Sequence, residues 1–71
     1  MKARRLLVVL LREPLNYRIV RQRGSHRILA APNRPTFVFA FHDRTELPGG
    51  LVRSVLVKDV GLEEEEALDL L

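Results

Sequence analysis

Two histidines and a dense set of arginines are the side chains of this chain that could perform chemistry. His26 follows the pair Gly24-Ser25, with Arg23 before the pair and Arg27 after the histidine. An imidazole with an ordinary pKa of about 6.5 exchanges a proton near neutral pH, and guanidinium groups suit phosphate oxygens. This combination indicates RNA, either bound or cleaved.

RNA hydrolysis without a metal ion needs three functions. A base removes the 2′-OH proton, cations stabilise the charge on the pentavalent phosphorus, and an acid protonates the leaving 5′-oxygen. We predict His26 as the base and His42 as the acid. The RNA contacts are predicted to come from Arg21, Arg23, Ser25, Arg27, Arg44 and Arg53. No metal and no cofactor is expected, because two histidines and scattered acids lack metal-ligand spacing.

Each of these assignments has a simpler alternative. A histidine after a turn can be a solvated strand residue, and His42 can be a hydrogen-bond partner within a loop. The run Glu63–Glu66 is interpreted as a solvated helix start, with phosphate mimicry or autoinhibition as the alternative. Three aromatic residues share one face of a predicted strand, where core packing is favoured over a base-stacking platform: Phe37, Phe39 and Phe41.

The charge is spread unevenly along the 71 residues. Residues 1–58 contain all 12 Lys and Arg and three acids, a net charge of +9, whereas residues 59–71 contain six acids and no base. A cationic body of this kind is typical of proteins with a polyanionic partner. The apolar run at residues 6–11 is far shorter than the roughly 20 residues of a membrane span. We therefore expect a soluble, cytoplasmic protein with no membrane partner.

The residue pattern predicts one small α+β domain over residues 1–71 with the order α-β-β-β-α-α. Residues 2–13 are predicted to form a helix that ends before Pro14 and, being apolar almost all round, is buried on more than one side. Three strands should follow at residues 17–23, 26–31 and 36–41, with a loop at 32–35. A second helix should span about residues 50–60 and end at Gly61, before a short acidic helix within residues 62–71.

The pair Gly24-Ser25 is predicted to form a two-residue hairpin turn of type II′. Arg23 then pairs with His26 and Arg21 with Ile28, and all four lie on one face, continued by Tyr17, Ile19 and Ala30. If Ala31 pairs with Thr36, Phe41 faces His26. Both histidines are thus expected at one end of a three-stranded antiparallel sheet, where the hairpin tip projects past the core into solvent.

Several blocks of the sequence resemble those of the HicA-type (YcfA-like) toxins, small bacterial mRNA interferases that pair with a HicB antitoxin. The blocks are residues 20–26 (VRQRGSH), 41–42 (FH), 46–48 (ELP) and 50–56 (GLVRSVL), leading to Gly61. The resemblance implies a fold like that of double-stranded-RNA-binding domains and mRNA cleavage by the histidine of the GSH motif, here His26. It also matches His42 to the second histidine of the family. A HicB-like antitoxin is expected to cover the active site, so the protein would be a monomer alone and a hetero-oligomer with its antitoxin.

Two hypotheses therefore stand. The first is a toxin that acts as a metal-independent endoribonuclease. The second is a non-catalytic RNA-binding module, or an inactivated toxin retained for partner binding. The second is favoured by Gly49 and Leu51, which stand where the family frequently has lysine and threonine.

Overall fold

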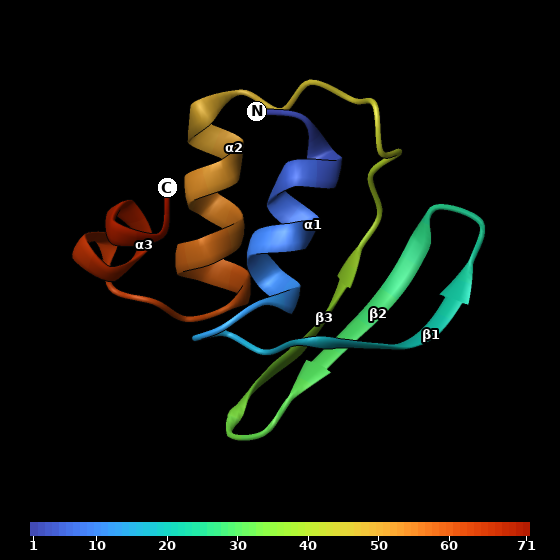
Figure 1. Cartoon of the computed structure of the whole chain (residues 1–71), viewed down its shortest axis with the longest axis horizontal. Coiled ribbons are helices and arrows are strands. Elements are labelled where there is room, and N and C mark those ends of the chain that lie inside the picture. Colours follow the sequence, from blue (N-terminus) through green and yellow to red (C-terminus); the bar gives the residue numbers. More distant parts are fainter.

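The computed structural model describes all 71 residues and contains helices on one side of a three-stranded sheet (Figure 1). The elements follow the predicted order: α1 (Ala3–Leu11), β1 (Arg18–Arg23), β2 (His26–Ala31), β3 (Arg34–Phe39), α2 (Gly49–Ser54), η1 (Val55–Asp59) and α3 (Glu64–Leu70). The strands are antiparallel and lie in the order β1-β2-β3. The predicted α+β class is confirmed, and the arrangement agrees with the double-stranded-RNA-binding-like fold of HicA toxins.

Helix α1 buries one stripe of apolar side chains and leaves the opposite side in solvent. The buried residues are Ala3, Leu6, Leu7, Val9 and Leu10. The helix ends at Leu11, two residues short of the prediction. Val8 is 50% exposed and Leu11 is 37% exposed, so the prediction of burial on more than one side was wrong for these residues. One buried apolar stripe is the usual pattern of an amphipathic helix that covers a core.

The first hairpin has the predicted register near its turn and a bulge further from it. Arg23 pairs with His26 and Arg21 with Ile28, as expected. Val20 is then an extra residue, because the next pair is Ile19 with Leu29. A bulge of this kind reverses the faces of the residues beyond it. Ile19 therefore shares the face of Leu29, and the prediction that Ile19 and Tyr17 continue the His26 face was wrong; Tyr17 is only 2% exposed within the core.

The second hairpin is tighter than predicted. Ala31 pairs with Arg34, not with Thr36, and Pro32-Asn33 form a two-residue turn in which Asn33 has φ 61°. Asparagine tolerates this left-handed conformation better than most residues, which is why the chain can reverse here so quickly. As a result β3 begins and ends two residues early. Arg27 lies opposite Phe39, and Phe41 lies beyond the strand rather than opposite His26.

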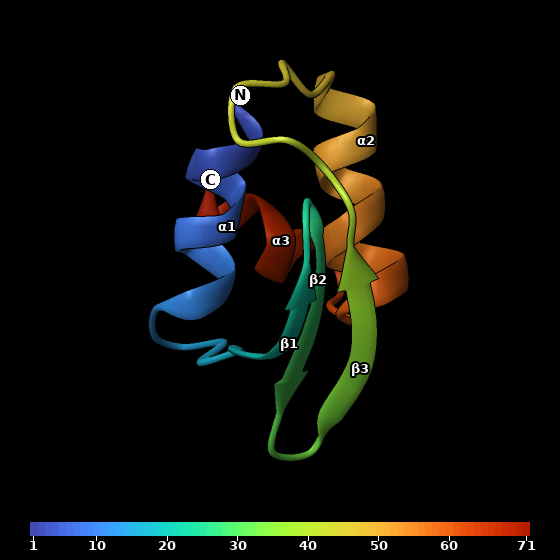
Figure 2. The ribbon, with the colours of Figure 1, turned by 90° about the vertical axis from the view of Figure 1, so that its right-hand side faces the viewer.

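The core lies between the helices and one face of the sheet, while the opposite face of the sheet is uncovered (Figures 1 and 2). Phe39 is 1% exposed, and Phe37 and Phe41 are half-buried against the core. Edge-to-face contacts join Phe37 to Tyr17 and Phe41 to Phe39, each with ring centroids 5.2 Å apart. The three phenylalanines thus pack in the core, as favoured, and are not a base-stacking platform.

The C-terminal helices are close to their predicted bounds. Helix α2 continues into the π-helical turn η1, which ends with a hydrogen bond from Val60 N–H to the Val55 carbonyl (3.0 Å), and Gly61 follows with φ 88°. Helix α3 begins with a capping box in which Glu63 N–H donates to the Glu66 side chain at 3.1 Å. Figure 1 shows α3 on the far side of the helices from the β1–β2 turn, so α3 does not cover that turn. None of the helices has the length and apolar character that a membrane crossing requires.

Candidate nucleic-acid interface

The turn between β1 and β2 carries the predicted site and stands away from the helices (Figure 1). Gly24 has φ 59°, and Ser25 does not share this positive angle, as a turn of type II′ requires. The Gln22 side-chain amide donates to the Gly24 carbonyl at 3.1 Å and supports the turn. All six residues of β1 are exposed, so the tip is held by strand pairing rather than by burial.

His26 lies on the uncovered face of the sheet, together with arginine side chains. A hollow of about 300 Å³ on this face is lined by Arg21, Arg23, His26, Ile28 and Val38. His26 is exposed, so a ligand can reach its side chain. Arg21 and Arg23 line the same hollow, so an anion placed there would lie near an imidazole and two positive charges. The hollow therefore contains a base and cations, the groups that are required to remove a proton next to a phosphate.

Arg27 belongs to the opposite face because successive strand residues alternate between the two sides of the sheet. Its partner across the strands is the buried Phe39, and its side chain is only 12% exposed. Nη2 of Arg27 donates to Oδ1 of Asp43 at 2.9 Å, whereas Nη1 is buried and has no hydrogen-bond partner in the protein. Arg27 lines a second hollow, of about 350 Å³, with Gly24, Ser25, His42 and Asp43.

The two histidines therefore share one end of the sheet but not one hollow. His42 lines the same hollow as Gly24 and Ser25, which confirms that it comes to the hairpin tip. His26 lines the hollow on the other face. The Gly24-Ser25 turn lies between these two faces. A ligand that contacts both histidines would therefore have to pass over this turn.

The segment that carries His42 is anchored by the start of α1. Ala3 N–H donates to the Thr45 carbonyl at 2.8 Å and Arg4 N–H to the Asp43 carbonyl at 3.0 Å. The ammonium group of Met1 forms an ion pair with Glu46, and Lys2 lies 3.6 Å from the same carboxylate. The hydrogen bond from this ammonium group is the main cause of the lowered pKa of Glu46. These contacts fix the backbone at Asp43 and in the residues that follow it.

The remaining predicted contacts are not brought to the two hollows. The Arg44 carbonyl accepts a hydrogen bond from Lys2 Nζ at 3.3 Å, and the Arg44 side chain lines neither hollow. Arg53 lines a separate hollow of about 220 Å³ on α2, with Lys58 among its neighbours. Asp43 was not predicted as the partner of Arg27. The only sign of this pair in the sequence was an acid directly after His42 in a strongly basic segment.

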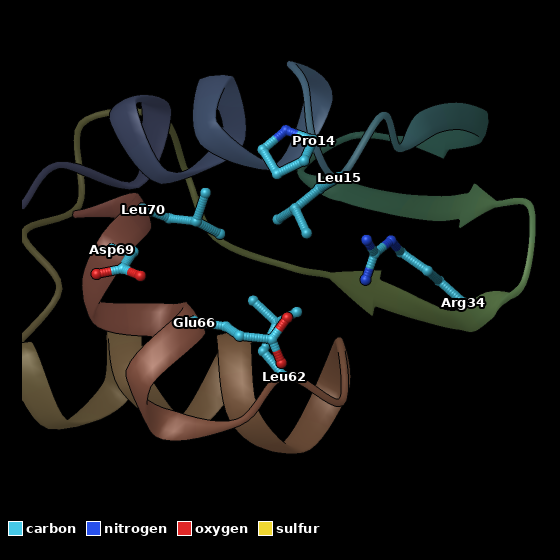
Figure 3. Close-up of a pocket in the computed structure, with 7 residues that line it drawn as sticks. All are labelled: Pro14, Leu15, Arg34, Leu62, Glu66, Asp69 and Leu70. Carbon is cyan, nitrogen blue, oxygen red and sulfur yellow. The ribbon is translucent and has the colours of Figure 1, made fainter.

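A further hollow, of about 250 Å³, lies between α3 and the start of β3 (Figure 3). Arg34 extends toward it from the strand, Glu66 and Asp69 lie on the side of the helix, and Leu15 and Leu62 are further lining residues. It contains neither histidine and no nucleophile. No three histidine or acidic side chains in the structure are grouped so that they could hold a metal ion.

The fold and this interface define a small α+β protein with a cationic, titratable hairpin tip. The sequence model of the family described as the HicA toxin of bacterial toxin-antitoxin systems matches residues 4–62, and the chain belongs to this family. Membership identifies the class of function, the toxin of a toxin-antitoxin pair, and implies an antitoxin as partner. Comparisons with curated proteins and with solved structures find no match for the chain. The matched residues include the whole interface and exclude α3.

Proposed function

We propose that this toxin is a metal-independent endoribonuclease that cleaves mRNA in the cytoplasm with His26 as general base. The observation that carries the proposal is the exposed imidazole in one hollow with Arg21 and Arg23, in a chain that belongs to a toxin family. The +9 charge of residues 1–58 supports a polyanionic substrate.

In the proposed reaction, neutral His26 accepts the proton of a ribose 2′-OH. The 2′-oxygen then attacks the adjacent phosphorus, and Arg21 and Arg23 stabilise the charge on the pentavalent intermediate. The bond to the 5′-oxygen breaks, which leaves a 2′,3′-cyclic phosphate on one product and a free 5′-OH on the other. Each step uses only protons and oxygens already present in RNA and in the side chains.

His42 remains our proposal for the acid that protonates the leaving oxygen. Because His42 lines the hollow on the other face of the sheet, this role requires the leaving strand to pass over the Gly24-Ser25 turn. Ser25 and Arg27 line the same hollow as His42 and are proposed to bind RNA along this path. Arg44 and Arg53 line neither histidine hollow and are proposed to bind RNA outside it.

The alternative is a non-catalytic RNA-binding module or an inactivated toxin. The observation in its favour is the start of α2, where Gly49 and Leu51 provide no cation or hydroxyl and no side chain caps the helix. In this case RNA would stay intact, while binding would still weaken as salt is raised.

The deciding experiment incubates the pure protein with RNA in EDTA and examines the product ends by mass spectrometry. We expect cleavage, cyclic phosphate ends, and no cleavage of a matched all-deoxy oligonucleotide that lacks the 2′-OH. Intact RNA with salt-sensitive binding would support the alternative, and metal-dependent cleavage would contradict the proposed reaction.

The partner is proposed to be a HicB-like antitoxin that covers the hairpin tip. A tip that binds RNA through exposed arginines has to be shielded in the inactive pair. The toxin is expected to be a monomer alone and to form a hetero-oligomer with the antitoxin, which sedimentation of the separate and mixed proteins would measure.

A further inference from the structure

The hollow that contains Arg27 differs from the His26 hollow in one respect that the proposed reaction does not use. The side chain of Arg27 is mostly buried, and Nη2 of its guanidinium group is held by Asp43. The second nitrogen, Nη1, is buried and has no hydrogen-bond acceptor in the protein. A buried polar group left unpaired costs free energy, and the cost is larger for a charged group. The positive charge of Arg27 is therefore only partly compensated within the protein, and an anion in the hollow that Arg27 lines would stabilise it.

We propose that this hollow is a second phosphate subsite, which holds the phosphate next to the one that reacts at His26. The proposal rests on the proposed function, since it takes RNA as the ligand. Arg27 supplies the guanidinium group, Ser25 supplies a hydroxyl, and His42 lies in the same wall. Together these groups suit the several oxygens of a phosphate, which accept charge-assisted hydrogen bonds.

Asp43 acts in this subsite as a positioning residue for Arg27. Its carboxylate binds Nη2 at 2.9 Å and thereby fixes the plane of the guanidinium group. The backbone of Asp43 is itself held, because its carbonyl accepts the Arg4 N–H from the first turn of α1. Asp43 also lines the hollow, and its negative charge is paired with Nη2 of Arg27. Nη1 is buried, so the guanidinium group acts on a ligand in the hollow through its positive charge and not through a bond from Nη1.

The two hollows lie on opposite faces of the sheet, with the turn between them. An RNA strand that occupies both hollows must bend over Gly24-Ser25. The reacting phosphate would then lie in the His26 hollow and the next phosphate in the Arg27 hollow. Gly24 has no side chain, and an added Cβ there would meet no atom within 4 Å, so the edge is open to a close approach by the ribose-phosphate backbone.

The test compares two small ligands that cannot be cleaved. They are the dinucleotide of 2′-O-methyluridine, with one phosphate, and the same dinucleotide with a 3′-phosphate, which adds a second phosphate on the side of the leaving strand. We expect the wild-type protein to bind the second ligand about tenfold more tightly, as is typical for added hydrogen bonds between charged groups. Arg27→Gln should bind the two ligands alike.

Two controls separate the subsite from a general loss of charge. Arg18→Gln removes one positive charge from the far end of β1, and Arg21→Gln removes one from the His26 hollow. Both should keep the tenfold ratio, although both lower affinity in general. If Arg27→Gln also keeps the ratio, the second subsite is refuted.

Arg27 is mostly buried, so Arg27→Gln could destabilise the fold. A titration of the wild-type protein followed by NMR avoids this problem. The two-phosphate ligand should shift the resonances of Ser25 and Arg27, and the one-phosphate ligand should leave these two in place. Equal shifts with both ligands would overturn the proposal. Because neither readout requires cleavage, a subsite that fails here is distinguishable from a protein that fails to cut RNA.

Discussion

The hairpin tip and helix α3 are highly charged regions of opposite sign, and they differ in almost every other respect. The tip is positive, belongs to the residues that match the toxin family, and is held by strand pairing. Helix α3 is negative, begins after the matched residues end, and is attached through the buried Ala67. No ion pair joins the two regions or involves any acid of α3.

This difference predicts that the proposed chemistry and the stability of the protein depend on different parts of the fold. The exposed side chains of the tip, such as His26 and Arg23, can be altered with little loss of core packing. Helix α3 contributes apolar burial beside Leu62, and its acids would repel an RNA ligand from that end of the molecule. Changes at the tip should therefore alter RNA cleavage, and changes in α3 should alter local stability.

The largest effect is expected for His26→Ala. Loss of the general base should lower the rate of RNA cleavage by about 10³-fold, and the melting temperature should be unchanged because His26 is exposed. Rates and thermal unfolding measured in parallel would check this. The matched control in α3, Glu65→Gln, should leave the rate as it is. A His26 variant that still cleaves RNA at the wild-type rate would disprove the mechanism.

His42→Ala should lower the rate by about 10²-fold, the lower end of the range for a general acid. A substrate with sulfur in place of the leaving 5′-oxygen needs no proton from an acid, because a thiolate is a much better leaving group. The variant should cleave this substrate at the wild-type rate. Equal impairment on both substrates would show that His42 binds RNA and does not protonate the leaving atom.

Ala67→Asp should release α3 from the core without an effect on cleavage. Ala67 is 1% exposed, so the new carboxylate would be buried without a partner, at a cost of about 2 to 3 kcal/mol. Hydrogen exchange should show faster exchange over Glu64–Leu70. The control is Leu68→Asp, which introduces an aspartate at a residue that is 59% exposed. Exchange should stay slow in this variant. A loss of cleavage in Ala67→Asp would mean that the two regions are coupled.

Gly24→Ala should destabilise the tip by about 1 to 2 kcal/mol, the cost of a left-handed conformation for a residue with a Cβ. Gly24 has φ 59°, and an added Cβ would meet no other atom, so the effect is purely conformational. Urea unfolding would measure it. Gly50→Ala is the control, since Gly50 lies in a helix and alanine should stabilise it.

Tyr17→Phe is expected to have the smallest effect, about 1 kcal/mol from the lost hydrogen bond between the Tyr17 hydroxyl and the Pro35 carbonyl (2.7 Å). Burial raises the pKa of Tyr17, so the folded state ionises less readily than the unfolded state. Stability should therefore fall as the pH rises above about 10, where the unfolded tyrosine ionises. Unfolding measured from pH 8 to 11 should show this decline in the wild type and a flatter profile in the variant.

Local signals in the sequence were sufficient for the order of the elements and for the first turn. The Gly24-Ser25 pair, Pro14 and Gly61 each act on their own neighbours, and the structure has a turn or a helix end at or near each of them. What could not be predicted depends on contacts between distant segments. The bulge at Val20 allows Tyr17 to reach the core, and the pair between Arg27 and Asp43 depends on the register of β2 and β3.

The separation of the two histidines onto opposite faces has the same origin. Both histidines were assigned to one end of the sheet from the direction of the strands, and both line hollows at the hairpin tip. Which hollow each one lines was not predicted, because His42 follows the end of β3 and the path of that loop leaves little trace in the amino-acid pattern. Arg44 was included for its place after His42 and Arg53 for its place in the GLVRSVL block, and neither place fixes the direction of the side chain.

The extra residue in β1 has a consequence for how this protein can diversify. Val20 divides the strand into two halves, an inner half that leads to the buried Tyr17 and an outer half that carries Arg21 and Arg23 beside His26. Under the proposed function, substitutions in the outer half should alter nucleotide preference while the inner half keeps its packing partners. Deletion of this single valine would couple the halves again and force either Tyr17 out of the interior or the arginines into it.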